Sequence, residues 1–153
     1  MKKIIVIYHS QQFGNTKVMA EEIARGIFDA GGTTEMINTN ERRVTLYDIR
    51  EAGAVALGTP DYYSYPAGTI KTLFDDLYLW DKAGEIIKGK PAVLFMSHGG
   101  GGRAKQPFET FADRFFKRVK ETIICRHPIN DDAKKHCYEL GKELVLKISN
   151  NVN

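Results

Sequence analysis

Residues 4–32 read IIVIYHSQQFGNTKVMAEEIARGIFDAGG and join two hydrophobic patterns across one short polar turn. Ile4 to Tyr8 is a continuous apolar, mostly β-branched run, typical of a strand buried on both faces. An apolar face at helical spacing follows, and Gly31-Gly32 ends it as a helix C-cap does. The residues of that face are Ala20, Ile23, Ala24 and Ile27. A buried strand followed at once by an amphipathic helix predicts the first unit of a parallel α/β sheet.

The same alternation continues to the end of the chain. Further strands are expected at 33–37, 53–58, 92–96 and 122–125, and a short helix or turn is expected at 45–51. Three more helices are expected from their apolar faces. The first has Ile70, Leu73, Phe74 and Leu77 on this face, and the second has Phe108, Phe111, Ala112, Phe115 and Val119, with Pro107 at the first helical position. The third begins at Asn130-Asp131-Asp132 and carries Cys137, Leu140, Leu144 and Ile148. These elements predict one α/β domain over residues 1–153: a three-layer, doubly wound, five-stranded parallel sheet with strand order 2-1-3-4-5.

Composition excludes several classes of protein. The chain is 42% hydrophobic and 27% charged, and no apolar run approaches the roughly 20 residues of a membrane helix. The N-terminal apolar run turns polar at His9, before a signal-peptide cleavage site, so we expect a cytoplasmic protein without membrane insertion. The net charge of +3 is interleaved with acidic residues, which argues against a nucleic-acid partner.

Cysteine and histidine spacing predicts no metal site. Cys125 and Cys137 are twelve residues apart, and the four histidines are scattered along the chain. We expect reduced structural thiols and histidines without a metal.

In an open parallel sheet, ligands bind beyond the carboxyl ends of the strands where the strand order reverses. The first loop at that edge, Ser10-Gln11-Gln12-Phe13-Gly14-Asn15-Thr16, offers hydroxyls, amides and the start of a helix. A helix N-terminus holds a phosphate without a charged side chain, and Gly14 permits close backbone approach. The pattern is neither a Walker A loop nor GxGxxG. The alternative is an ordinary turn capped by Asn15 or Thr16.

The second and third loops are equally unusual. Residues 59–68, TPDYYSYPAG, carry three tyrosines, which either stack on a planar ligand or pack over the sheet edge or in a subunit contact. Residues 97–103, SHGGGGR, have four consecutive glycines, whose conformational cost suggests close backbone approach to a flat ring, with Arg103 near developing charge. The alternative for this loop is a mobile surface segment without a ligand.

These residues resemble the flavodoxin-like family over essentially the whole chain. Ile7-Tyr8, Ser10, Gly14-Asn15-Thr16 and Ala20 resemble the phosphate-loop signature, with one more residue between Ser10 and Gly14 than the commonest spacing. Gly58-Thr59-Pro60 with Tyr62-Tyr63, and Ser97-His98-Gly99-Gly100, resemble the two loops beside the flavin ring.

The resemblance implies non-covalent FMN. The phosphate would lie among Ser10, Gln12, Phe13, Gly14, Asn15 and Thr16. The ring would be bordered by Thr59, Pro60, Asp61, Tyr62, Tyr63 and Ser64, and by Ser97, His98, Gly99, Gly100, Gly101 and Gly102. Backbone N–H groups of the second loop would bond flavin N5, and Tyr62 or Tyr63 would stack on the ring.

Two departures from the family bear on function. Electron-carrier flavodoxins are usually acidic and often place an aromatic in the third loop, whereas this chain is basic and its third loop is nearly all glycine. A less negative surround should ease flavin reduction. The related NAD(P)H:quinone oxidoreductases often carry an insertion, and none is present here.

The leading hypothesis is an FMN protein that transfers electrons, with a redox protein as partner. The alternative is a small reductase acting on NAD(P)H and a quinone-type acceptor, in which His98 either donates to the acceptor or merely caps its loop. Either protein could be oligomeric. A signalling receiver is excluded because it needs acidic residues where His9-Ser10 and Thr59-Pro60 stand. A cofactor-free binding module on the same fold is the third possibility.

Overall fold

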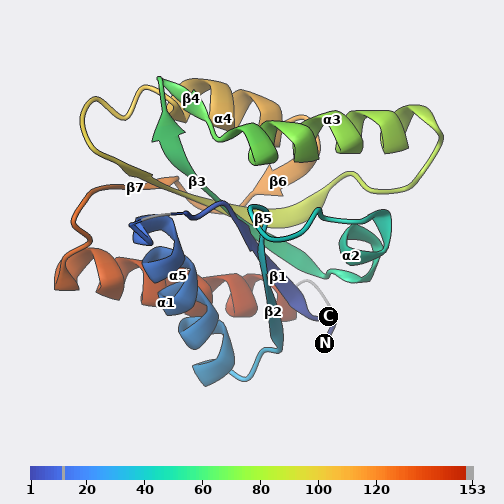
Figure 1. Ribbon diagram of the computed structural model, residues 1–153. Helices are drawn as coiled ribbons and strands as arrows, with labels where there is room; N and C mark the ends of the chain where they lie inside the picture. Colours follow the sequence, from blue (N-terminus) through green and yellow to red (C-terminus); the bar gives the residue numbers. More distant parts are fainter. Residues whose placement is uncertain (12, 151–153) are drawn as a thin grey trace.

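A parallel sheet runs through the middle of the protein, with helices on both of its faces (Figure 1). The computed structural model describes residues 1–11 and 13–150. Strands β1 (Ile4–Tyr8), β2 (Thr34–Asn38), β3 (Ala54–Tyr62) and β5 (Lys90–His98) lie in the order β2-β1-β3-β5, and each pair is parallel. The alternating pattern of the sequence therefore predicted the central strands and their order correctly.

The last position in the sheet is shared by two short strands. β6 (Phe116–Arg118) pairs with the start of β5, and β7 (Ile123–Arg126) pairs with its end. The expected helix is confirmed as α4, which spans Lys105–Ala112, but its extension through Phe115 and Val119 was wrong. Phe115 lies in a turn, Phe116 begins β6, and the Val119 N–H beyond β6 donates to the Ala92 carbonyl across the sheet. Pro107 is the third residue of α4 rather than the first.

β3 is longer than the sequence indicated and ends in a hairpin. Residues expected as loop, Thr59 to Tyr62, continue the strand, and β4 (Tyr65–Pro66) folds back antiparallel to it. Pro60 is tolerated because β1 ends opposite Gly58, so the missing N–H faces no partner strand there. On its other side Pro60 pairs in register with Ser97 of β5.

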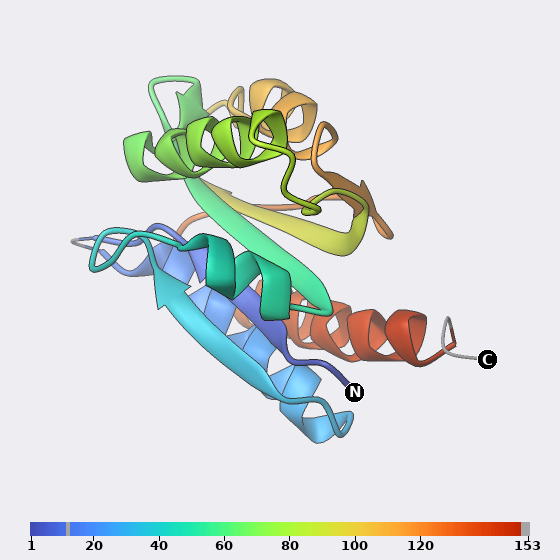
Figure 2. The same cartoon turned by 90° about the vertical axis from the view of Figure 1, so that its right-hand side faces the viewer.

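Two apolar cores fill the space between the sheet and its helices. Helices α1 (Asn15–Asp29) and α5 (Asp131–Ser149) cover one face, and α2 (Leu46–Glu51), α3 (Gly68–Lys82) and α4 cover the other (Figure 2). The expected short helix at 45–51 is confirmed as α2. No helix in the described part of the chain is long and apolar enough to cross a membrane.

Two glycines set the distance between α1 and α5. A Cβ on Gly26 would lie 2.0 Å from the Tyr138 carbonyl oxygen, and one on Gly141 would lie 2.1 Å from the Ile23 carbonyl oxygen. The helix backbones are therefore in direct contact at this crossing. α1 begins at the phosphate loop, so this crossing supports the site.

Helix α2 begins with a complete capping box. Thr45 accepts from the Asp48 N–H, and the Asp48 carboxylate accepts from the Thr45 N–H at 2.8 Å. Arg42 donates to both carboxylate oxygens of Asp48. Burial alone would raise the pKa of Asp48, but the hydrogen bonds from Arg42 and Thr45 outweigh it and lower the pKa to about 2.

Candidate cofactor site

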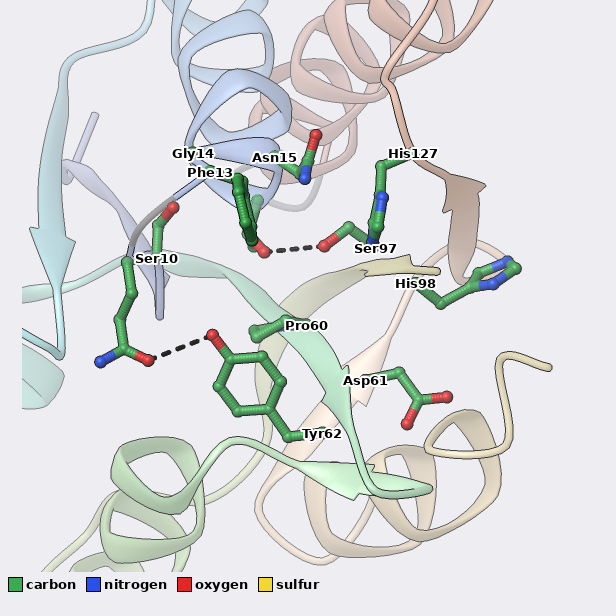
Figure 3. A pocket seen from close by; sticks show the side chains of 12 residues that line it. Ser10, Phe13, Gly14, Asn15, Pro60, Asp61, Tyr62, Ser97, His98 and His127 are labelled. Atoms are coloured by element: carbon green, nitrogen blue, oxygen red, sulfur yellow. Dashed lines mark hydrogen bonds between the residues drawn. The ribbon is translucent and has the colours of Figure 1, made fainter. Parts of the chain in front are cut away.

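A cavity of about 260 Å³ opens at the carboxyl edge of the sheet, among the ends of β1, β3, β5 and β7 (Figure 3). Its lining residues are Ser10, Gln11, Phe13, Gly14, Asn15, Thr16, Pro60, Asp61, Tyr62, Ser97, His98 and His127. Three of the strand ends were expected to meet here, and the residue after β7 joins them. The topology therefore concentrates polar side chains from distant parts of the sequence at one edge.

The first loop leaves the start of α1 open. Gly14 is the N-cap residue with φ of 67°, a left-handed conformation that favours glycine, and no side chain in the described part of the chain caps the helix. Neither Asn15 nor Thr16 is the N-cap; both lie inside the helix. The alternative of an ordinary side-chain-capped turn is therefore wrong. The first backbone N–H groups of α1 remain available to an anion.

Three hydroxyl groups surround that helix start. Thr16 Oγ1 and Ser97 Oγ are hydrogen-bonded at 2.9 Å, which ties α1 to the end of β5. Ser10 is held through its backbone, since its N–H donates to Asn38 Oδ1 and its carbonyl accepts from Asn38 Nδ2. Its own Oγ is buried and has no hydrogen-bond partner among residues 1–11 and 13–150. An unsatisfied buried hydroxyl costs about 1–3 kcal/mol, so this atom fits a ligand oxygen.

The three tyrosines of the hairpin have different surroundings. Tyr62 lines the cavity, and its hydroxyl donates to Gln11 Oε1 at 3.2 Å; burial raises its pKa. Tyr63 is fully exposed at the tip, where Tyr63 and Ser64 have φ of 55° and 63°. Positive φ at both tip residues is the type I′ geometry that matches strand twist, at a conformational cost for residues other than glycine. Tyr65 packs on Phe111 with ring centroids 6.0 Å apart, so the packing alternative holds for this residue.

Thr59 and Asp61 position the hairpin. Thr59 is fully buried and does not line the cavity; its hydroxyl donates to the Pro60 carbonyl and accepts from the Ala67 N–H at 2.9 Å. Asp61 lines the cavity and accepts from the Ala104 N–H at 3.4 Å. The second loop is thus fixed at its base and linked to the third.

The third loop begins later than the sequence suggested, because Ser97 and His98 still belong to β5. Gly99 to Gly102 follow without lining the cavity, and only Gly102 among them has a positive φ, of 63°. A Cβ on Gly102 would lie 3.5 Å from His98 Cδ2, so the imidazole packs against the loop. Figure 3 shows the His98 ring turned away from the cavity centre. The opposite side of the loop contacts His127, whose ring atoms lie 3.1 Å from the Cβ position of Gly99.

His9 lies beneath Tyr62, and its hydrogen-bonding neighbours determine which of its two ring nitrogens carries the proton. His9 Nδ1 lies 2.6 Å from Thr69 Oγ1, which lies 2.7 Å from Thr39 Oγ1. Thr39 uses its only hydroxyl proton on the Tyr8 carbonyl, so Thr69 must donate to Thr39. His9 Nδ1 must then donate to Thr69. In the neutral ring Nε2 is an acceptor, and it is buried without a partner.

The structure brings most of the expected site residues together. Those at the cavity are Ser10, Phe13, Gly14, Asn15, Thr16, Pro60, Asp61, Tyr62, Ser97 and His98. Thr59, Tyr63, Ser64 and Gly99 to Gly102 do not line it, and Gln12 lies outside the described residues. Sequence reasoning did not select Gln11 or His127. Gln11 lies within the same loop, and His127 directly follows the last strand, so position alone could have indicated both.

The cysteines and acidic residues form no metal centre in the part of the chain that the structure describes. No group of three or more His, Cys, Asp or Glu side chains there could hold an ion. Cys125 and Cys137 are buried as free thiols.

Comparison with known proteins identifies the family. The flavodoxin family model matches residues 6–139. A flavodoxin of Aquifex aeolicus is 31% identical over 163 residues, covering 95% of this chain and 86% of the relative. Among solved structures, a flavodoxin from the domain Archaea superposes with a TM-score of 0.83 at 25% identity, covering 96% of this chain and 99% of that one.

A second kind of relative is much longer. The coenzyme F420H(2) oxidase of Methanothermobacter marburgensis is 29% identical over 150 residues, which cover 96% of this chain but 36% of the relative. The chain therefore spans about a third of the length of this curated relative. An open helix start, an unsatisfied hydroxyl and an aromatic wall all fit a flat, phosphate-bearing cofactor. The chain belongs to the flavodoxin family, whose cofactor is FMN.

Proposed function

We propose that this chain acts as an electron carrier that receives electrons from one redox protein and passes them to another. FMN, when bound, supplies the redox chemistry. Ser10, Thr16 and the start of α1 would hold the phosphate, and Pro60 and Tyr62 would border the ring. The account needs no acid–base catalyst from the protein.

The orientation of His98 supports a carrier over a reductase. A reductase of the kind considered would use His98 to donate to a bound acceptor, but this ring packs on Gly102 and turns away from the cavity (Figure 3). One observation favours the alternative: His127 does line the cavity and could serve as a proton donor there. An NAD(P)H-dependent reductase is therefore the second candidate.

The cytoplasm is the proposed location. The apolar run Ile4–Tyr8 forms a fully buried strand of the sheet. The buried free thiols Cys125 and Cys137 suit a reducing compartment.

Two measurements test the proposed function. The purified protein loaded with FMN should show a protein-bound flavin spectrum, and saturating FMN should stabilise the fold, by about 2.7 kcal/mol at 100 times Kd. Under anaerobic conditions dithionite should bleach the flavin, whereas NADH and NADPH should not. Rapid bleaching by either nucleotide would contradict the carrier and establish the reductase. A colourless protein with no FMN-induced stabilisation would instead favour the cofactor-free module.

A further inference from the structure

Most arginines of this protein are neutralised by neighbouring carboxylates. Ion pairs hold Arg25, Arg42, Arg43, Arg50 and Arg118. No such pair is recorded for Arg103, Arg114 or Arg126 within residues 1–11 and 13–150. All three are exposed. Two of them, Arg103 and Arg126, lie next to the cofactor cavity.

Arg103 and Arg126 both lie beside the glycine loop at the end of the sheet. Arg126 is in register with His98 on the neighbouring strand. Ile124, two residues before Arg126 and so on the same face, approaches Gly102, at 3.7 Å from its Cβ position. Arg103 runs along the same loop, with Cγ 3.5 Å from the Cβ position of Gly101. Two exposed guanidinium groups, neither of them in an ion pair within the described residues, thus lie beside the glycine loop.

The opposite side of the cavity mouth is aromatic and uncharged. Phe13 is 80% exposed, Tyr62 is 40% exposed and Tyr63 is fully exposed. Two carboxylates lie near the guanidinium side: Asp61, which accepts from the Ala104 N–H, and Asp132, which shares an open groove with Arg126. Exposed aromatics beside unpaired arginines are the composition of a protein–protein contact surface.

We propose that this surface, defined by Phe13, Tyr63, Arg103 and Arg126, docks an acidic redox protein and directs it to the flavin edge. The proposal rests on the proposed carrier function and adds the chemistry of the partner. Charge complementarity selects an acidic partner, because two exposed arginines that form no ion pair within the described residues attract a negative face over about 10 Å. The surface also continues past Arg126 into the groove between β7 and α5, which a protein would cover more fully than a small molecule.

The charge of the proposed docking surface is measured with two inorganic oxidants of opposite charge. FMN-loaded, reduced protein is mixed in a stopped-flow instrument with trianionic ferricyanide or with tricationic tris(phenanthroline)cobalt(III). Each oxidant takes one electron from the reduced flavin, giving ferrocyanide or cobalt(II). At low ionic strength we expect ferricyanide to react faster than in about 0.3 M salt, by roughly three- to tenfold, and the cobalt complex to show the opposite dependence.

Matched charge reversals locate the effect. Arg103→Glu combined with Arg126→Glu should slow ferricyanide about tenfold at low salt and accelerate the cobalt complex. Arg114→Glu with Lys117→Glu changes the net charge equally, at the amino-terminal edge of the sheet, and should change both rates less than twofold. Arg103→Gln with Arg126→Gln should give an intermediate result. Flavin content and melting temperature establish that each variant is folded and loaded.

A macromolecular competitor identifies the class of partner. Poly-glutamate should slow the ferricyanide reaction of the wild-type protein and leave Arg103→Glu/Arg126→Glu unaffected. NADP⁺ at the same concentration of negative charge should have a much smaller effect. The proposal is overturned if the two charge-reversed pairs behave alike, or if NADP⁺ competes as well as poly-glutamate. Failure of the carrier function would appear separately, as bleaching by NADH or NADPH.

Discussion

The two sides of the cofactor cavity are built in opposite ways. On the phosphate side, Ser10 and Thr16 are buried and hydrogen-bonded to the sheet, and Thr16 lies on α1, whose backbone contacts α5. On the glycine-loop side, the Cβ position of Gly100 meets nothing within 4 Å, and Arg103 and Arg126 are exposed. The first side has neutral donors and the second has the positive charge.

We infer that the phosphate side binds the cofactor and that the glycine-loop side guides the partner that exchanges electrons with it. A neutral, rigid site binds a phosphate through oriented N–H groups and hydroxyls. Binding then does not require long cationic side chains to be ordered, with the loss of conformational entropy that this would entail. An exposed charged side acts at longer range and on an approaching partner. Substitutions on the two sides should therefore affect different measurements.

The largest expected effect compares a glycine beneath the phosphate side with one in the glycine loop. Gly141→Ala would gain about 1 kcal/mol of helix propensity, but its Cβ would lie 2.1 Å from a backbone oxygen of α1. The helices must separate, and we expect the free energy of unfolding to fall by at least about 2 kcal/mol. Gly100→Ala meets nothing within 4 Å and should change it by less than about 0.5 kcal/mol. Chemical denaturation measures both, and equal effects would remove the claimed difference in rigidity.

The next effect concerns the unsatisfied hydroxyl of Ser10. Ser10→Ala should weaken FMN binding about 10- to 100-fold, because a hydrogen bond to a charged phosphate is lost. The same change should leave the protein without FMN as stable as before, or slightly more stable, since a buried hydroxyl without a partner disappears. Thr34→Val removes a second unpartnered hydroxyl at the far end of the sheet and is the control. Fluorescence titration with FMN should distinguish the two, and a similar loss in both variants would argue against Ser10 as a ligand.

A smaller effect concerns Asp48, which lies outside the cavity. It tests whether a change in the free energy of unfolding there leaves FMN affinity unchanged. The pKa of Asp48 is lowered to about 2 from an ordinary value of 3.8, so its contribution is present above pH 4 and is lost as pH falls toward 2. Asp48→Asn should lower the free energy of unfolding by about 2 kcal/mol at pH 7. The difference from wild type should shrink as the pH is lowered through this window. FMN affinity at pH 7 should not change, and a change in affinity would connect α2 to the site.

The smallest effect is a spectroscopic one beneath Tyr62. Nitrogen NMR of the protein without FMN, at pH 8, should show His9 as the Nδ1–H tautomer, because Thr69 and Thr39 leave no other donor for that contact. Thr69→Val should remove this preference. Observation of the Nε2–H tautomer in the wild-type protein would refute the hydrogen-bond chain.

The sequence predicted those features of the structure that a hydrophobic pattern within one segment determines, and it missed those that depend on pairing with distant segments. The order of the central strands followed from alternating periods, and the meeting of Ser10, Pro60 and Ser97 followed from that order. The split fifth strand could not be predicted, because Phe116 to Arg118 is too short to show a period and is fixed by pairing with β5. The different orientations of Tyr62, Tyr63 and Tyr65 depend on a hairpin whose tip has unusual φ values in residues other than glycine. His127 was missed because only the three earlier loops were considered as the binding edge, although His127 directly follows β7 and lines the cavity.

The central claim, that Ser10 to Thr16 bind a phosphate with neutral donors, is tested most directly by comparing FMN with riboflavin. The two flavins differ only by the phosphate, so the ratio of their Kd values isolates that group. Measured by fluorescence titration at constant ionic strength, FMN should bind the wild-type protein at least about 100-fold more tightly, and Ser10→Ala with Thr16→Val should abolish most of the difference. Equal affinities for FMN and riboflavin in the wild-type protein would contradict the account.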